Sequence, residues 1–391
     1  MCVRTDKNIE FNLNCEYFTF SIREIKTAET RMSGKAMYAV IMAGGRGTRF
    51  WPRSTEKRPK HLLEVFGSKS LLRETFERIR PLVPVENIIV VTGQGHVRDV
   101  RRQLPEIPGE NVLIEPEGRN TAPCIGLAAI NLLRKDPTGT MIVLPADHYI
   151  ADRESFLSAI DAAARTAEIG GLVAVGVKPR GPETGYGYVE KGEPSGLKKG
   201  VKVYRARSFR EKPDLRKAKE FVRSNRFLWN SGIFAWKASV ILDAIQSNLP
   251  ELHRGLLEIK KALGSRGEKS VIRKVYRSIE PVSIDYGVME KSRDVFLVEG
   301  SFGWSDVGSW DALLDLLPGD DNENVIIGNA VSIDAEKSYV YSPDRLVALL
   351  GVKDLIIVDT PDSLLICRRG MSQDVKKIVD HLEKKKMIKY F

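Results

Sequence analysis

The chain of 391 residues has 61 Lys and Arg against 51 Asp and Glu, and its 42% hydrophobic and 29% charged content is typical of a globular protein large enough for more than one domain. No apolar run approaches the about 20 residues that a membrane helix needs, and no Lys/Arg-rich arm with interleaved aromatic residues indicates nucleic-acid binding. The formal net charge of +10 suits a polyanionic ligand, although a solvated basic surface explains it equally well.

The first 36 residues differ from the rest of the chain. They carry mixed charges and lack the apolar core of a signal peptide. The regular pattern begins at Met37, which is itself a candidate start codon. We therefore expect residues 1–36 to be a dispensable leader.

Apolar runs alternate with helical patterns between residues 38 and 144. Strands are predicted at 38–42, 87–92, 112–115 and 140–144, and helices at 70–80, 95–104 and 123–134. Strands separated by helices of this length favour βαβ crossovers, so we expect an α/β fold with a mostly parallel, Rossmann-like sheet. Ligands of such sheets bind beyond the carboxyl ends of the strands, where Gly45, Glu115 and Asp147 fall.

The pattern changes after residue 171. Strands at 171–177, 187–190, 204–209 and 232–236, with helices at 214–225 and 240–263, predict a mixed-sheet extension that closes over the site. The loop at 318–322 predicts a boundary between a domain of residues 37–318 and a β-rich domain of residues 319–391, which ends in a charged helix at 372–386. This β-rich domain is a candidate contact surface for a homodimer.

A glycine-rich loop with clustered cations follows the first predicted strand. Residues 43–49 read Ala-Gly-Gly-Arg-Gly-Thr-Arg, and Lys57 and Lys60 come soon after. Glycine lets backbone N–H groups approach a phosphate because no Cβ stands in the way. The loop lacks the residue order of a P-loop and the third glycine of the dinucleotide fingerprint. It therefore predicts a polyphosphate cradle of another kind.

Two acidic residues are candidates for holding a metal ion. Asp147 ends the fourth predicted strand, and Asp306 lies in the glycine-flanked loop 303–308. Mg²⁺ is usually held by one or two carboxylates together with substrate phosphates, so this pair suits it. Asp147 could equally well cap the helix that follows Ala151. We interpret His148 as structural, since no second histidine lies near it in the chain.

The segment 115–123 follows the third strand and opens a helix. Guanine offers N–H donors on one edge, and a carboxylate such as Glu115 or Glu117 is a natural acceptor for them. Pro123, with Asn120 and Thr121 before it, is also what an ordinary helix N-terminus contains. The sequence leaves both interpretations open.

Three further segments could bind a sugar phosphate. Glycines alternate with aromatic residues in 183–190, where Glu190 could reach hydroxyl groups of a ligand. The same pattern is also typical of a hairpin edge with glycine bulges. Lys212 ends a strand and suits a phosphate monoester, although surface Lys–Glu neighbours are common. Asn230 could bind hydroxyl groups or only satisfy a turn.

No pattern points to covalent catalysis or to a zinc site. The chain has no G-x-S-x-G elbow, and no cysteine and histidine stand at a recognisable spacing. The four cysteines, Cys2, Cys15, Cys124 and Cys367, are widely scattered. Such cysteines fit a reducing compartment, so we expect a cytoplasmic protein.

Together these segments resemble a known family. The loop 44–60 resembles the signature of sugar-1-phosphate nucleotidylyltransferases. The segments 115–123, 144–148, 183–190, 209–213, 229–234, 284–291 and 303–310 narrow the resemblance to the mannose-1-phosphate guanylyltransferases. The resemblance runs from about residue 37 to the C-terminus. It implies a nucleotide-diphospho-sugar transferase domain followed by a small domain like part of a left-handed β-helix. It also implies transfer of GMP from GTP to α-D-mannose 1-phosphate, with Mg²⁺ as cofactor.

The resemblance also implies roles for individual residues. The triphosphate would be held by Gly44, Gly45, Gly47, Thr48 and Arg49, and the phosphates at the reacting centre by Lys60. The guanine loop would contain Glu115 and Asn120, and Mg²⁺ would be held by Asp147 and Asp306. Mannose would be held by Gly185, Glu190 and Asn230, and its phosphate by Lys212. Arg49, Lys60, Asp147 and Lys212 would be the catalytic set. For Asp285 a sugar-binding and a structural role remain open. Two alternatives are the same chemistry on another sugar and nucleotide, and a regulatory subunit without activity.

Overall fold

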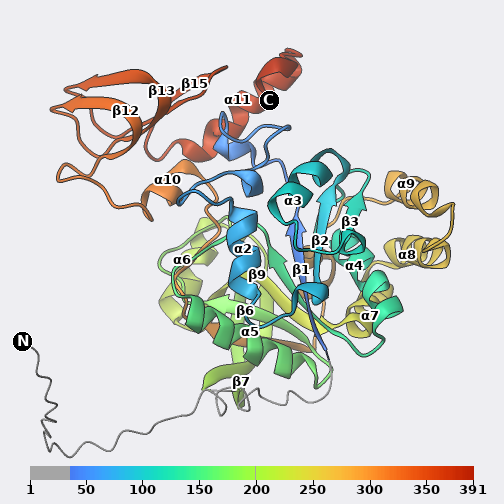
Figure 1. The fold of residues 1–391 in the computed structure, drawn as a ribbon. Helices are drawn as coiled ribbons and strands as arrows, with labels where there is room; N and C mark the ends of the chain where they lie inside the picture. The colour runs from blue at the N-terminus through green and yellow to red at the C-terminus, as the bar shows by residue number, and fades with distance from the viewer. Residues whose placement is uncertain (1–35, 199) are drawn as a thin grey trace, which may run out of the picture. The chain divides into compact units, whose positions relative to one another are not determined.

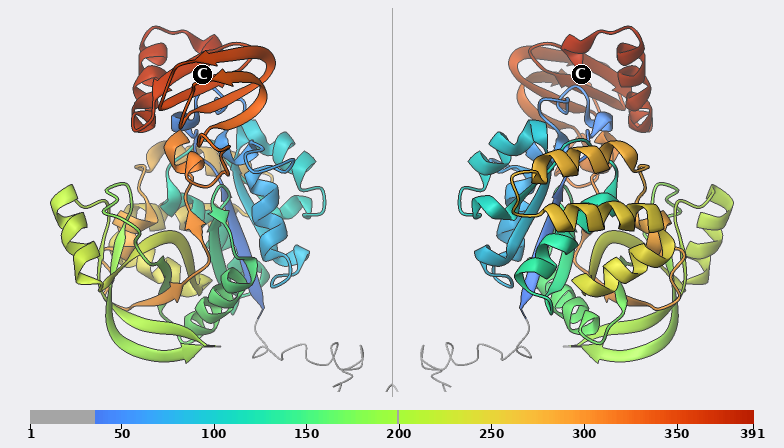
Figure 2. Two further views of the ribbon diagram at one scale, coloured as in Figure 1. Left: turned by 90° about the vertical axis from the view of Figure 1, so that its left-hand side faces the viewer. Right: turned by 90° about the vertical axis from the view of Figure 1, so that its right-hand side faces the viewer.

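The computed structural model describes residues 36–198 and 200–391, so the expected leader lies, apart from residue 36, outside the described residues. The core of the fold is a nine-stranded sheet with helices on both faces (Figures 1 and 2). Its strand order is β3-β2-β1-β4-β9-β6-β10-β8-β7. No helix in the described part of the chain is both long and apolar enough to cross a membrane.

The first half of the sheet agrees with the sequence prediction. It consists of β1 (Met37–Ala43), β2 (Ile88–Gly93), β3 (Val112–Glu115) and β4 (Thr140–Pro145). All four are parallel to one another, with Ala39 beside Ile88 in β2 and Ile142 in β4. The apolar residues of these strands are buried because helices cover both faces of the sheet. Strands buried on both faces have continuous apolar sequences, which is why the sequence pattern predicted them.

Helices α2 (Leu71–Ile79), α3 (Val97–Gln103), α4 (Thr121–Lys135) and α5 (Arg153–Ala167) alternate with these strands. Ser70 caps α2 by accepting a hydrogen bond from the backbone N–H of Arg73 at 3.1 Å. Asp152 caps α5 in the same way, through the N–H of Ser155 at 3.0 Å. The cap of α5 is therefore Asp152, which removes the alternative role considered for Asp147.

The second half of the sheet is mixed. It contains β6 (Leu172–Val177), β7 (Tyr188–Lys198), β8 (Val201–Arg210), β9 (Phe227–Lys237) and β10 (Val295–Gly300), with α6 (Leu215–Ser224) between β8 and β9. Strands β8 and β9 run against the other seven, so the sheet is mostly parallel, as expected. Strand β10 was not predicted from the sequence, and the predicted lengths of β7 and β9 were too short.

One face of the sheet carries a layer of packed helices. These are α4, α7 (Ala238–Asn248), α8 (Pro250–Ala262) and α9 (Glu268–Ser278), which share one apolar cluster with the sheet. The single helix predicted over 240–263 is two helices, because Pro250 cannot continue the first one. Helices α2 and α5 contact each other on the opposite face (Figure 1).

The C-terminal part is β-rich and ends in a helix, as predicted. Its four-stranded sheet consists of β12 (Val325–Ile333), β13 (Tyr339–Leu350), β14 (Leu355–Asp359) and β15 (Leu364–Arg368), with α10 (Trp310–Leu314) before it and α11 (Val375–Lys384) after it. The first three strands are parallel and β15 is antiparallel. Residues 36–391 form one compact unit, so the domain boundary at 318–319 stays a prediction.

Candidate active site

A cavity of about 1010 Å³ opens beyond the carboxyl ends of β1, β3 and β4, where the fold class places ligands. Of the residues singled out in the sequence, it is lined by Gly44, Gly45, Glu115, Asn120, Asp147, Gly185, Asn230, Asp285 and Asp306. A smaller cavity of about 210 Å³ shares Asp147 and Asp306 with it and adds Gly47, Arg49 and Lys60. Segments that lie far apart in the chain thus meet at one place.

The two candidate metal-binding acids are brought together by a short pair of strands. Strand β5 (Tyr149–Ile150) begins just after Asp147, and β11 (Trp304–Ser305) ends just before Asp306. The two strands are antiparallel, with Ser305 beside Tyr149. Because the chain directions are opposite, the residues that precede β5 lie near those that follow β11. Two acids separated by 159 positions therefore lie at the same site.

Lys60 joins these two segments. Its ammonium Nζ lies 2.9 Å from Oδ2 of Asp147 and donates a hydrogen bond to the backbone carbonyl of Asp306 at 2.6 Å. Burial alone would raise the pKa of Asp147, but Lys60 and His148 outweigh it, and the pKa is lowered. Asp147 is thus held ionised. The Asp306 carboxylate accepts hydrogen bonds from the Tyr186 hydroxyl at 2.6 Å and from the N–H of Gly308 at 2.9 Å.

The chemistry of these donors suits a hard divalent cation bound together with a ligand. In the described residues no group of three or more His, Cys, Asp or Glu side chains forms a complete metal cage. Two carboxylates beside a phosphate-sized cavity are the arrangement that Mg²⁺ tolerates, since it keeps several waters and takes further oxygens from phosphates. Asp147 and Asp306 could therefore hold such an ion when a polyphosphate is present.

The glycine loop has the geometry that its sequence predicts. Gly45 and Gly47 have φ angles of 91° and 60°, which favour glycine. A Cβ on Gly47 would lie 2.6 Å from the Cβ of Lys60, so no larger residue fits there without displacing that lysine. Gly44 and Gly45 face open space, which leaves their backbone free to approach a ligand. Thr48 begins the short helix η1 (Thr48–Phe50) and lines neither cavity.

The candidate base-binding loop contains a buried carboxyl group. Glu115 is only 6% exposed, and its Oε1 accepts a hydrogen bond from the Tyr276 hydroxyl at 3.1 Å. Burial raises the pKa of Glu115 to about 7, although the Tyr276 hydrogen bond acts against this. Asn120 has a φ of 70°, which is strained for any residue but glycine, and strain of this kind is common at functional sites. Tyr276, on α9, was not singled out by any sequence pattern.

At the other end of the cavity, four segments of the chain meet. The Asn230 amide donates to Oδ1 of Asp285 at 2.8 Å, and both residues line the cavity with Gly185 and Glu211. Oε2 of Glu211 is buried without a hydrogen-bond partner among the described residues. Burial, together with the Asp285 charge, raises the pKa of Glu211, and burial also raises that of Asp285. Buried oxygens of this kind could accept hydrogen bonds from sugar hydroxyl groups.

The residue Gly187 explains why this end stays open. A Cβ at Gly187 would lie 2.3 Å from Oε2 of Glu211 and 3.2 Å from the Cβ of Asn230. The alternation of glycine and aromatic residues therefore makes room for Glu211. The sequence pointed to Lys212 but not to its neighbour Glu211; the signal available was the acidic residue directly before that lysine.

The structure does not support the role expected for Glu190. Its carboxylate accepts a hydrogen bond from Ser208 at 3.1 Å and lies 3.7 Å from Nε of Arg226, and the residue does not line the cavity. Glu190 lies in β7, three residues after Gly187, and is paired with Ser208 of β8. Glu211, rather than Glu190, lines the cavity beside Asn230.

Lys212 lies beside the cavity rather than in its wall. Its side chain is 54% exposed, and its Nζ lies 2.8 Å from Oε1 of Glu211.

His148 accepts a hydrogen bond on Nδ1 from the indole N–H of Trp304 at 3.1 Å, and burial lowers its pKa to about 4. His148 also lines both cavities, so the structural role that we inferred for it stays a prediction.

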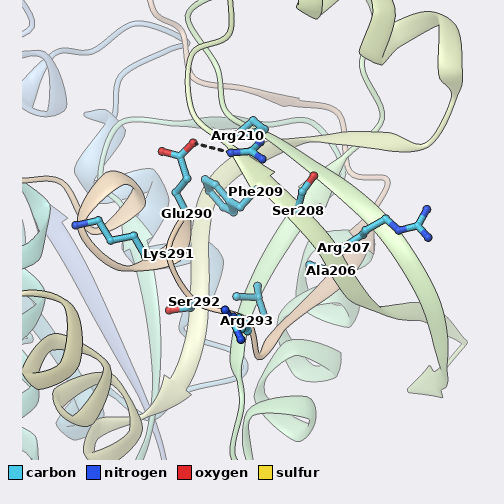
Figure 3. A pocket seen from close by; sticks show the side chains of 10 residues that line it. Ala206, Arg207, Ser208, Phe209, Arg210, Glu290, Lys291, Ser292 and Arg293 are labelled. Carbon is cyan, nitrogen blue, oxygen red and sulfur yellow. Dashed lines mark ion pairs between the residues drawn. The ribbon is translucent and has the colours of Figure 1, made fainter.

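Another hollow, of about 250 Å³, lies between β8 and the segment 290–295 (Figure 3). Arg210 and Glu290 form an ion pair there at 3.8 Å, while the side chains of Arg207 and Lys291 extend in opposite directions. The basic side chains of this hollow do not converge, and none of the residues assigned to the site lines it.

Comparison with known proteins agrees with this geometry. A model of the nucleotidyl transferase family matches residues 38–323, and a model of the MannoseP isomerase/GMP-like beta-helix domain matches residues 328–382. A mannose-1-phosphate guanylyltransferase of Escherichia coli is 39% identical over 351 residues, which are 88% of this chain and 75% of that protein. The chain belongs to the mannose-1-phosphate guanylyltransferase family. An enzyme of the same name from Salmonella typhimurium is 39% identical over 88% of this chain and 72% of its own.

Solved structures of this type share the fold. A structure described as a mannose-1-phosphate geranyltransferase from Thermus thermophilus has a TM-score of 0.78 and 36% identity, and covers 89% of this chain and 99% of its own. A structure described as a mannose-6-phosphate isomerase from Helicobacter pylori has a TM-score of 0.57 and 30% identity, and covers 69% of this chain and 99% of its own. The family assignment therefore extends from the catalytic sheet to the β-rich C-terminal part.

Proposed function

We propose that this protein transfers GMP from GTP to α-D-mannose 1-phosphate, giving GDP-mannose and pyrophosphate. The observation that carries the proposal is a pair of cavities that share Asp147 and Asp306: the smaller adds Lys60, and the larger joins the glycine loop to a polar end with Glu211, Asn230 and Asp285. The first part suits a triphosphate and the second suits a sugar. Membership of the mannose-1-phosphate guanylyltransferase family supports this pair of substrates over others.

The reaction is an in-line displacement. A phosphate oxygen of mannose 1-phosphate forms a bond to the α-phosphorus of GTP, and the bond from that phosphorus to the bridging oxygen of pyrophosphate breaks. The attacking oxygen is already anionic near neutral pH, so no general base is needed. The main barrier is repulsion between two anions. Lys60 and Arg49 line the triphosphate side and would offset this charge while the cavity holds the two substrates in line.

Mg²⁺ is the cofactor that we propose, and when bound it would neutralise charge on the phosphates. Asp147 and Asp306 would hold it. Lys60 contacts both segments that carry these acids, so it would keep their spacing fixed and place its own charge beside them. Asp147, Lys60, Arg49 and Lys212 form the proposed catalytic set.

The two specificity ends follow from the same geometry. Glu115, and Glu117 beside it, would accept hydrogen bonds from the N–H donors of guanine, with Asn120 shaping the loop. Glu211, Asn230 and Asp285 would bind hydroxyl groups of mannose, with Gly185 close to the ring. Lys212 would reach the sugar phosphate from the edge of the cavity.

The proposal is tested by measuring pyrophosphate release from matched substrate pairs. GTP with mannose 1-phosphate should be used in clear preference to UTP, dTTP or ATP, and to glucose 1-phosphate. Faster release from UTP or dTTP with glucose 1-phosphate would move the function to that pair. No release from any pair, with GTP still bound, would favour a regulatory subunit on the same fold.

We further propose that the protein acts in the cytoplasm as a homodimer, with no membrane or nucleic-acid partner. The outer face of the C-terminal sheet exposes aliphatic side chains on neighbouring strands, namely Val331, Ile333, Leu346 and Leu350. Ile333 pairs with Leu350 in the register of these strands, so the side chains form one surface. Exposed apolar patches of this kind favour association. Light scattering of the protein and of a Leu350→Glu variant would test the dimer.

A further inference from the structure

The C-terminal segment lies directly on the phosphate loop. Three side chains of the loop form hydrogen bonds or an ion pair with this segment. Arg49 donates from Nη1 to Oε1 of Gln373 at 2.8 Å, Trp51 donates from its indole N–H to the carbonyl of Tyr390 at 2.6 Å, and Arg46 contacts Glu383. Gln373 lies in the short helix η7 (Ser372–Asp374), immediately before α11.

The phosphate loop and the C-terminal segment also share one apolar core. Phe50 and Trp51 of the loop are buried in one cluster with Val375 and Val379 of α11. The same cluster contains Trp310, whose ring centroid lies 4.8 Å from that of Phe50. The indole N–H of Trp310 donates to the backbone carbonyl of Trp51 at 3.2 Å. The C-terminal segment therefore has a fixed position relative to the loop, and residues on it can aim loop side chains.

The two arginines are held by partners of different charge. Glu383 is a carboxylate, so it offsets the positive charge of Arg46 as well as contacting it. Gln373 is a neutral acceptor, so it fixes the direction of the Arg49 guanidinium and leaves its full positive charge in place. A guanidinium has five N–H donors in a rigid fork, and one bond to Gln373 leaves the others for a phosphate. Only Arg49 of the two lines the smaller cavity with Lys60, Asp147 and Asp306.

We propose that Gln373 is a positioning residue for GTP, acting through Arg49. It comes from the β-rich C-terminal part and directs a cation of the nucleotidyltransferase part toward the triphosphate. The C-terminal part is then not an appended module but a component of the nucleotide site. This inference rests on the proposed function, because the triphosphate role of Arg49 does.

The test is GTP binding by titration calorimetry, together with steady-state kinetics, on Gln373→Met, Arg49→Lys and the double variant. Gln373→Met keeps the side-chain size and removes the acceptor. It should weaken GTP binding and raise the KM for GTP about five- to tenfold, as loss of a hydrogen bond to a charged group predicts. The KM for mannose 1-phosphate should change less than twofold. The unfolding temperature should not change, because Gln373 is exposed.

The double variant separates positioning from a general effect. If Gln373 acts through Arg49, Gln373→Met should have little further effect on GTP binding in the Arg49→Lys background. Gln246→Met is the matched control, since Gln246 is an exposed residue of α7, and it should behave as the unaltered protein. Unchanged GTP binding in Gln373→Met, or equal losses in both backgrounds, would overturn the inference. Failure of the unaltered protein to release pyrophosphate would instead refute the proposed function.

Discussion

At the phosphate end of the cavity the charged side chains are paired. Lys60 contacts Asp147, and Arg49 and Arg46 contact Gln373 and Glu383. At the sugar and base end, by contrast, Glu115 and Glu211 are acids with raised pKa values, and one buried oxygen of Glu211 has no hydrogen-bond partner in the part of the chain that the structure describes. Pairing fixes side chains that would stabilise a charged transition state, whereas Oε2 of Glu211, unpaired among the described residues, leaves a hydrogen bond for a ligand to complete. Under the proposed function, the first end would perform catalysis and the second would provide selectivity.

The strongest test of this comparison is Asp147→Asn. Loss of the carboxylate removes a proposed Mg²⁺ ligand and the partner of Lys60, so kcat should fall about a hundredfold or more. The unfolding free energy should be measured alongside, because the Lys60 side chain is only 8% exposed and loses its ionised partner. The measurement is pyrophosphate release at saturating GTP and mannose 1-phosphate.

Asp152→Asn is the matched control for this variant. Asp152 caps α5, and asparagine is an equally good cap, so the control should keep normal turnover and stability. Near-normal turnover in Asp147→Asn would remove Asp147 from the catalytic set, and with it the assignment of catalysis to the phosphate end.

The buried carboxyl of Glu115 should appear in the pH dependence of stability. Its pKa is about 7 in the folded protein, above the 4.5 of an exposed glutamate, so the folded state retains a proton that the unfolded state releases. The favourable contribution of this proton is complete below pH 4.5 and is lost as the pH rises through about 7. Glu115→Gln cannot titrate and should gain stability relative to the unaltered protein by about 3 kcal/mol across this range.

Urea unfolding of both proteins at a series of pH values measures this difference. A constant difference in unfolding free energy between pH 5 and 8 would show that Glu115 titrates normally and is therefore solvated. Glu117→Gln is the control, because Glu117 lies in the same loop and its carboxylate contacts Arg119 at 2.9 Å.

Glu211→Gln tests the sugar end directly. The amide keeps the shape of the side chain but replaces one acceptor with a donor, next to the sugar hydroxyl groups. The KM for mannose 1-phosphate should rise about tenfold, while the KM for GTP should change little. Glu220→Gln on the exposed face of α6 is the control and should leave both constants unchanged. An equal effect on both substrates would mean that the two ends are not separable.

The sequence revealed the phosphate end better than the sugar end for a physical reason. The loop residues Gly44, Gly47 and Arg49 are neighbours in the chain and follow one buried strand, so their function is visible in a local pattern. The sugar end is assembled from Gly187, Glu211, Asn230 and Asp285, whose proximity depends on the mixed part of the sheet and on β10, which the sequence did not predict. Glu190 lies on β7 and Glu211 directly follows β8, so no pattern within a single strand could decide which of the two carboxylates faces the cavity. The support of Arg49 by Gln373 joins residues 324 positions apart, and no local pattern encodes it.

The smallest expected effect concerns Lys212. Its side chain is half exposed and already paired with Glu211, so screening by solvent limits its interaction with a sugar phosphate. Lys212→Ala should raise the KM for mannose 1-phosphate about three- to fivefold, less than Glu211→Gln, and the effect should shrink at high salt. Lys219→Ala, on the exposed face of α6, serves as the control. A change confined to GTP would place Lys212 at the phosphate end. An effect larger than that of Glu211→Gln would mean that the charge of Lys212 contributes more to binding of mannose 1-phosphate than the hydrogen bonds of Glu211.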